Sequence, residues 1–116
     1  MRIGQISKYR AKKTAYKGAI YDSGKEAKRA AELELLQRAG KIRNLRRQVK
    51  FTLQEGFLYE GHKIRAIEYV ADFVYEVDGL IIEDVKGYRT PEYKIKAKMM
   101  KRLIANGEID GKFKES

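Results

Sequence analysis

The chain has 116 residues, of which 43% are hydrophobic and 36% are charged, a composition typical of one globular domain with a heavily charged surface. It contains no cysteine, which excludes disulfides, zinc fingers and thiol catalysis. The sequence has no apolar run of transmembrane length and no signal-peptide-like segment at its N-terminus, so we expect a cytoplasmic protein.

The net charge of +10 is concentrated in blocks. Residues 1–21, 35–54 and 94–102 contain no acidic residue, and they hold most of the 26 lysines and arginines. Basic surface of this kind neutralises phosphates and releases counterions, so the pattern favours nucleic acid as the partner. A membrane partner is disfavoured because the basic segments lack the Trp, Phe and Leu face of an interfacial helix.

In chain order, residues 1–20 mix Lys, Arg, Gly and Tyr without periodicity, which predicts a flexible basic arm before a single domain at residues 21–116. A helix is predicted over about residues 24–39. Ser23 and Glu26 form a capping box at its start, and apolar residues recur at helical spacing after them.

Strands follow the first helix. The alternation of Val49, Phe51 and Leu53 with polar residues predicts one strand. Residues 57–59 either extend this strand or form a short one of their own, and residues 60–63 are typical of a turn.

The clearest strand pattern covers residues 64–75. It predicts one face made of Ile67, Tyr69, Ala71, Phe73 and Tyr75, and another made of Val70, Asp72 and Val74. Asp78-Gly79 then turns the chain into a further strand over residues 80–86.

A second helix is predicted to begin after Thr90, with Pro91 at its first position, and to end at Asn106-Gly107. Residues 108–116 are too short and polar a segment to predict an element. The order of helix, antiparallel strands and helix predicts an α+β fold, a helix–β meander–helix arrangement resembling an α/β sandwich.

Asp84 and Lys86 are two residues apart on a strand, so their side chains point to one face. Whether Asp72 joins them depends on the register of the hairpin. A two-residue loop, Asp78-Gly79, turns Asp72 away from Asp84, whereas a three-residue loop beginning at Val77 places the two directly opposite. Sequence rules leave both registers open.

In the second register the carboxylates of Asp72 and Asp84 lie roughly 5 Å apart, which is repulsive unless a cation lies between them. Carboxylate oxygens suit Mg²⁺, which lowers the pKa of a bound water and stabilises charge on a phosphate. Lys86 would orient the attacking water or neutralise developing charge. Asp-x-Lys alone is also common on solvated strand faces, but the apolar neighbours of these aspartates favour a functional site.

These residues resemble the PD-(D/E)xK nuclease superfamily, and more closely a small phage- and prophage-encoded family within it. The similar segments are residues 21–27, 47–51, 69–75 and 83–88. The resemblance implies a restriction-endonuclease-like core with a central mixed sheet flanked by helices. The sequence departs from the pattern at Ala71, where the namesake proline is replaced, and at Asp84, where glutamate is commoner.

The resemblance also implies roles for single residues. Asp72 and Asp84 would be metal ligands for Mg²⁺, with Mn²⁺ as a substitute, and Lys86 would be the motif lysine. Glu26 is either the acid that completes the metal site or only a capping-box residue. Glu83 is expected to point away from Asp84 into solvent, and His62 is expected to be exposed rather than catalytic.

Basic residues complete the expected site as phosphate contacts. They are Lys12, Lys13, Arg43, Arg46, Arg47, Lys94, Lys98 and Lys101.

The leading hypothesis is therefore a Mg²⁺-dependent endodeoxyribonuclease, selective for a site or a structure such as a Holliday junction, in phage DNA replication, recombination or packaging. Its DNA would be duplex or branched, and cutting both strands would imply a homodimer in the host cytoplasm. One alternative is a non-catalytic nucleic-acid-binding protein. The other is a phage protein that inhibits a host nucleic-acid enzyme.

Overall fold

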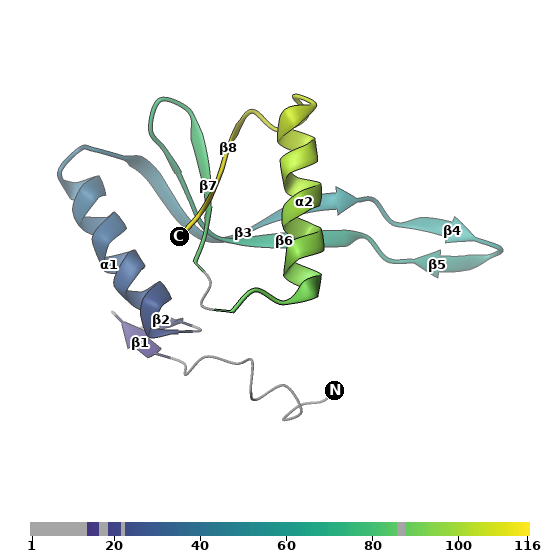
Figure 1. Cartoon of the computed structure of the whole chain (residues 1–116), viewed down its shortest axis with the longest axis horizontal. Coiled ribbons are helices and arrows are strands. Elements are labelled where there is room, and N and C mark those ends of the chain that lie inside the picture. Colours follow the sequence, from purple (N-terminus) through teal and green to yellow (C-terminus); the bar gives the residue numbers. More distant parts are fainter. Residues whose placement is uncertain (1–13, 17–18, 22, 86–87) are drawn as a thin grey trace.

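The protein has a mixed α+β fold with two helices (Figure 1). The computed structural model describes residues 14–16, 19–21, 23–85 and 88–116. The elements are β1 (Thr14–Tyr16), β2 (Ala19–Tyr21), α1 (Gly24–Arg38), β3 (Arg43–Gln54), β4 (Phe57–Tyr59), β5 (His62–Ile64), β6 (Ile67–Glu76), β7 (Leu80–Asp84), α2 (Pro91–Ala105) and β8 (Gly111–Glu115). The predicted α+β class is confirmed.

A four-stranded sheet in the order β3-β6-β7-β8 forms the centre of the fold. Strands β3, β6 and β7 pair antiparallel, and β8 pairs parallel with β7 from Leu80–Gly111 to Asp84–Glu115. The sheet is therefore mixed, as expected. Strand β8 was not predicted, because residues 108–116 are few and polar and their partner strand lies some thirty positions earlier.

Both helices begin and end where their capping residues predict. The side chain of Ser23 accepts a 3.1 Å hydrogen bond from the backbone N–H of Glu26, and Thr90 accepts one of 3.1 Å from Tyr93. The first turns of α1 and α2 both lie at the lower edge of the molecule in Figure 1. The positive ends of two helix dipoles therefore point toward one edge of the protein.

Two apolar clusters join the helices to the sheet. Ile81 and Val85 pack with α1, whereas Ile82 between them packs with α2, so the helices cover opposite faces of β7. Because both faces are covered, β7 is buried from Ile82 to its end at Asp84, and Val85 after it is buried as well.

The predicted alternation along β6 is wrong in one respect. Tyr69 and Ala71 pack with Val74 in the α2 cluster, whereas Phe73 and Tyr75 pack in the α1 cluster. The regular alternation therefore breaks between Ala71 and Phe73, at Asp72, so the residues expected on one face divide between the two helices.

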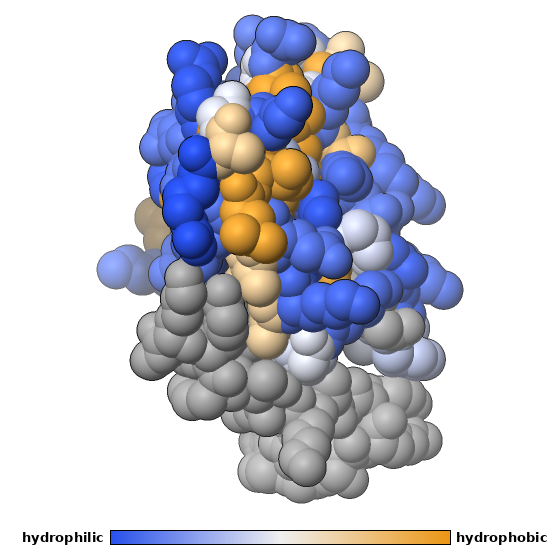
Figure 2. Space-filling model, turned by 90° about the vertical axis from the view of Figure 1, so that its left-hand side faces the viewer, coloured by the Kyte–Doolittle hydropathy of each residue, from blue (hydrophilic) through white to orange (hydrophobic). Residues whose placement is uncertain are grey.

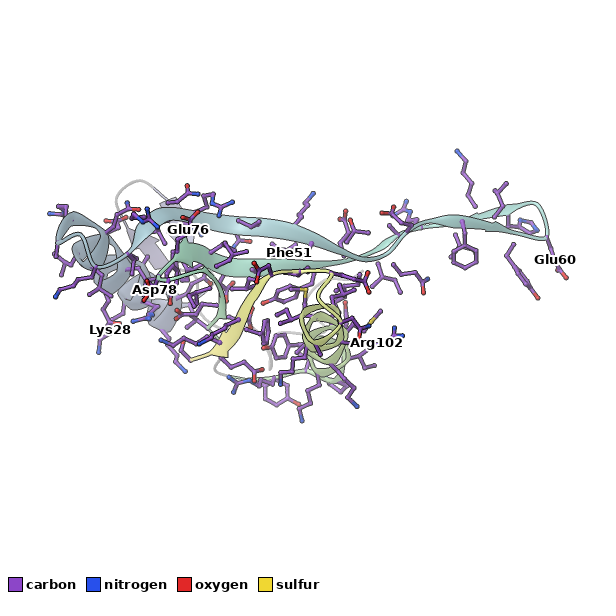
Figure 3. The ribbon with its side chains drawn as sticks, turned by 90° about the horizontal axis from the view of Figure 1, so that it is seen from above. Lys28, Phe51, Glu60, Glu76, Asp78 and Arg102 are labelled. Atoms are coloured by element: carbon purple, nitrogen blue, oxygen red, sulfur yellow. The ribbon has the colours of Figure 1, made fainter. Side chains whose placement is uncertain are left out.

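Strands β4 and β5 form an arm that projects beyond the body of the protein (Figures 1 and 3). The arm (residues 55–66) is exposed along its whole length. The turn predicted at residues 60–63 is shorter in the structure, because only Glu60 and Gly61 turn, with φ of 47° and 80°, and His62 begins β5. His62 is exposed, as expected.

Part of the segment expected as a flexible arm has regular structure. Strands β1 and β2 pair antiparallel and lie against α1. The prediction for residues 1–20 is therefore corrected at 14–16 and 19–20, and its remainder lies outside the described residues. No helix within the described ranges is long and apolar enough to cross a membrane.

Candidate functional site

The hairpin between β6 and β7 has the three-residue loop. Glu76 pairs with Leu80, the N–H of Val77 donates a 2.8 Å hydrogen bond to the carbonyl of Gly79, and Gly79 has a φ of 119° that favours glycine. The register runs to Phe73–Glu83. One further step places Asp72 across from Asp84, which is the register that the acidic site requires.

Asp72 and Asp84 are 4% and 0% exposed, so their carboxylates are inside the protein. Oδ2 of Asp72 accepts a 2.7 Å hydrogen bond from the backbone N–H of Val85. Oδ1 of Asp84 accepts one of 2.8 Å from the hydroxyl of Tyr69. Buried carboxylates require such donors, and a neighbouring like charge increases the need for a cation.

The phenols around Asp84 are poor acids. Burial raises the pKa of Tyr69 above its ordinary value, and the charge and hydrogen bond of Asp84 raise it further. Burial, the hydrogen bond to Glu115 and the charge of Asp84 likewise raise the pKa of Tyr93. Both hydroxyls therefore stay protonated at neutral pH and act as hydrogen-bond donors.

Glu26 lies in the first turn of α1 and is 2% exposed. Its backbone N–H forms the cap with Ser23, but its side chain reaches β3, where Oε2 lies 3.4 Å from Nε2 of Gln48 and 3.7 Å from Nη2 of Arg47. The helix cap and an inward-pointing carboxylate are therefore compatible, and sequence rules had presented them as alternatives.

Gln48 adjoins the candidate site and was not among the predicted site residues. The pairs Arg47–Phe73 and Val49–Ala71 place Gln48 beside Asp72, while its side chain donates to Glu26. Its φ of 53° is rare for a residue with a side chain. Such a conformation costs about 1–3 kcal/mol and tends to occur at functional sites. No sequence rule predicts its backbone conformation, although it lies in segment 47–51, which carries part of the family resemblance.

The donor set fits a hard cation in part. Two buried carboxylates facing across adjacent strands suit Mg²⁺, which commonly takes one or two carboxylates together with water and phosphate oxygens. The described residues contain no group of three or more His, Cys, Asp or Glu that could together hold a metal ion. The structure thus supplies the pair Asp72 and Asp84, and Glu26 as a third ligand stays a prediction. Lys86 lies outside the described residues.

The expected phosphate contacts fall into three groups. Arg43, Arg46, Lys94, Lys98 and Lys101 are exposed, whereas Lys12 and Lys13 lie outside the described residues. Arg47 is 32% exposed and its guanidinium points to Glu26. This arginine therefore belongs to the acidic site as much as to the basic surface.

The prediction that Glu83 points into solvent is wrong. Glu83 is 0% exposed on the α1 face of β7, where Arg29 donates to it from Nε at 2.6 Å and from Nη2 at 3.1 Å. The hydroxyls of Tyr75 and Ser116 donate as well. Burial by itself raises the pKa of Glu83, but these hydrogen bonds outweigh it, and the pKa falls below its ordinary value. The expectation failed because both faces of β7 are covered.

Exposed apolar side chains gather in two places. On the arm, the pairs Phe57–Ile64 and Tyr59–His62 put four exposed side chains on one face. On α1, Leu35 is 61% exposed. Figure 2 shows an apolar band along the side of the molecule that presents α1, with hydrophilic residues on both sides of it. Apolar patches of this kind are typical of interaction surfaces.

The fold and this site together define a mixed α+β protein with a buried acidic pair at the edge where both helices begin. Residues 6–111, most of the chain, match the family described as Protein of unknown function (DUF1064). The chain belongs to this family. No curated protein and no solved structure matches it.

Proposed function

We propose that this protein is a metal-dependent DNA endonuclease. The observation that supports the proposal most is the pair of buried carboxylates, Asp72 and Asp84, on adjacent strands of a mixed sheet. The cost of burying two like charges side by side is offset when a cation binds between them. The resemblance to the PD-(D/E)xK superfamily, in which matching positions hold Mg²⁺, leads to the same chemistry.

In this proposal Asp72 and Asp84 hold Mg²⁺, with Mn²⁺ as a substitute, and the metal supplies an activated water and stabilises charge on the phosphate. The chain's own groups orient the ligands. Tyr69 holds one oxygen of Asp84, and the N–H of Val85 holds one oxygen of Asp72. Glu26 completes the acidic site and Lys86 is the motif lysine.

The electrostatics of the surrounding surface favour a polyanionic substrate. The chain has a net charge of +10, and Lys94, Lys98 and Lys101 are exposed on α2, whose first turn holds Tyr93, a residue that the charge of Asp84 reaches. The N-terminal dipoles of both helices add positive potential at the same edge. A DNA backbone that reaches Asp84 would therefore meet basic groups along its path.

The substrate that we propose is duplex or branched DNA, with a four-way junction as a specific case, in phage replication, recombination or packaging in the host cytoplasm. Cutting both strands needs two sites, which a two-fold homodimer provides. Leu35 is exposed on α1, and the apolar band on the side of the molecule that presents α1 is consistent with such an interface (Figure 2).

The test is cleavage of labelled linear, nicked, flapped and four-way DNA with Mg²⁺ or Mn²⁺, for the wild type, Asp84→Asn and Asp78→Asn. Asp78 gives a matched control, because it is exposed in the β6–β7 loop and its φ of 48° suits asparagine. We expect cutting by the wild type and by Asp78→Asn, and none by Asp84→Asn. Equal cutting by all three would remove Asp84 from the mechanism.

A second candidate is a nucleic-acid-binding protein without catalysis. It is favoured by the absence of a three-acid group among the described residues and by the proximity of Arg47 to Glu26, which supplies a positive charge without a metal. This candidate predicts tight DNA binding that EDTA does not weaken, and no cutting on any substrate. The inhibitor alternative predicts instead a protein partner, with weak and salt-sensitive DNA binding.

A further inference from the structure

A basic pocket of about 300 Å³ lies on the α1 face of the sheet. Its wall is formed by the first half of α1 and the ends of β7 and β8, through Lys25, Lys28, Arg29, Glu32, Val85, Lys114 and Ser116. Lys28 lies at the end of the molecule opposite to the tip of the arm at Glu60 (Figure 3). The volume is at the lower limit of ligand sites, which run roughly from 300 to 1,000 Å³.

The pocket has an excess of positive charge. Arg29 is committed to structure, because its guanidinium pairs with the buried Glu83 and with Glu32. The pocket wall also carries Lys25, Lys28 and Lys114, whereas Glu32 is the one acidic side chain among its lining residues. An anion in the pocket would therefore meet more cations than it needs for neutrality, together with the positive end of α1.

The pocket adjoins the acidic pair through Val85. The side chain of Val85 lines the pocket, and the backbone N–H of the same residue donates to Asp72. A nucleic-acid strand placed with one phosphate at Asp72 and Asp84 could thus place a neighbouring phosphate, or its terminal phosphate, in the pocket. The two positions are on opposite sides of the end of β7, since residues 84 and 85 point to opposite faces.

We propose that this pocket binds a phosphate group of the substrate strand and so positions the strand at the acidic pair. The inference rests on the proposed function in taking the bound chain to be nucleic acid and the acidic pair to be the place where it is cut. The phosphate has two possible sources, a terminal phosphomonoester and an internal phosphodiester. Both have the same charged oxygens, and lysine binds them as a point charge.

The test measures binding in EDTA, where no metal-dependent cleavage occurs. Fluorescence anisotropy is recorded for one oligonucleotide sequence with a 5′-phosphate, a 3′-phosphate or hydroxyls at both ends. The pocket variant is Lys28→Gln with Lys114→Gln. Its control is Lys41→Gln with Lys112→Gln, which makes the same change of charge at two exposed lysines outside the pocket wall.

We expect the wild type to prefer a phosphorylated end by about tenfold, and the pocket variant to lose that preference while the control keeps it. For an internal phosphodiester, no end is preferred. The pocket variant then binds all three oligonucleotides more weakly than the control does. On duplex DNA, its plot of log K against log salt becomes less steep by about 0.9, because one phosphate contact is lost.

Equal weakening by the pocket variant and the control would overturn the inference, because only net charge would then matter. The two proposals fail separately. A wild type that never cuts but shows the pocket-specific loss of binding would refute the nuclease and retain the phosphate site. Normal cutting without a pocket-specific loss of binding would retain the nuclease and refute the phosphate site.

Discussion

The hydroxyl of Tyr69 on β6 donates a 2.8 Å hydrogen bond to Oδ1 of Asp84 on β7, inside the sheet. Burial and the charge of Asp84 keep this phenol protonated, so it remains a donor to the carboxylate across the neutral pH range. Asp72 is held in a similar way by the backbone of Val85. The fold itself therefore orients both carboxylates, which is the condition for a preorganised metal site.

Tyr69→Phe should lower both stability and cleavage. The substitution removes a hydrogen bond to a buried charged group, which is worth about 1.5–3 kcal/mol. Urea denaturation measures the free energy of unfolding, and Tyr59→Phe on the exposed arm is the control. We expect the DNA dissociation constant to change little and the cleavage rate to fall. A Tyr69→Phe protein as stable and as active as the control would show that the hydroxyl does not position Asp84.

Metal binding should be visible without any substrate. If Mg²⁺ lies between Asp72 and Asp84, it binds the folded protein alone, and a concentration of 100 times its Kd stabilises the fold by about 2.7 kcal/mol. Thermal unfolding with Mg²⁺ and with EDTA should therefore differ for the wild type and for Asp78→Asn, and coincide for Asp84→Asn. A metal effect of the same size in Asp84→Asn would place the ion elsewhere.

The helices could be predicted because their signals are local. Ser23 and Thr90 cap the first turns, and the predicted bounds differ from the observed ones by about a residue. The register of the β6–β7 hairpin could not be decided from sequence, because loops of two and three residues both fit Asp78-Gly79. A shift of one residue in this register decides whether Asp72 faces Asp84. The arrangement of the acidic pair could therefore be established only from the structure.

The error at Glu83 follows from the layers of the fold. Alternation predicts exposure only when one face of a strand meets water, and β7 is covered by α1 on one face and α2 on the other. Glu83 was therefore expected in solvent and lies buried against Arg29. The backbone of Gln48 is equally invisible to sequence rules, because glutamine has no preference for positive φ.

Glu83 should make stability depend on acid. Its pKa is lower in the folded protein than in the unfolded chain, where it is about 4.3, so its contribution is complete above that value and is lost as the pH falls through the folded value. Glu83→Gln leaves Arg29 without its buried partner, and breaking such a pair costs about 3–5 kcal/mol near pH 7.

The measurement for Glu83 is urea denaturation of the wild type and Glu83→Gln from pH 7 down to pH 3. The difference between the two proteins should shrink below about pH 4.3. Glu76→Gln is the control, because Glu76 pairs with the exposed Arg43 at 3.7 Å and such surface pairs are worth about 0–1 kcal/mol. A constant difference across the pH range would mean that the charge of Glu83 contributes nothing.

Gly56→Ala should loosen the arm and leave the rest of the protein unchanged. A Cβ at Gly56 would lie 2.9 Å from the carbonyl oxygen of Ile64, so the backbone of β5 must move. Overpacking of this kind costs about 1–3 kcal/mol. Amide hydrogen exchange should speed up in β4 and β5 while β6 and β7 keep their protection. Glu55→Ala, beside it on the exposed surface, should leave the arm intact.

Gln48→Gly should separate stability from activity. Glycine adopts the φ of 53° without strain, so the substitution relieves the backbone and should leave stability equal or raise it by up to about 1 kcal/mol. It also removes the side-chain amide of Gln48, which donates to Glu26 from the position across from Asp72. We therefore expect slower cleavage from a protein that unfolds no earlier. Asn44→Gly is the matched control, because Asn44 is exposed and has a φ of 56°. Relief of the backbone strain at Asn44 should leave cleavage unchanged. Gln48→Gly that cuts as fast as Asn44→Gly would mean that the left-handed backbone at Gln48 serves the fold and not the site.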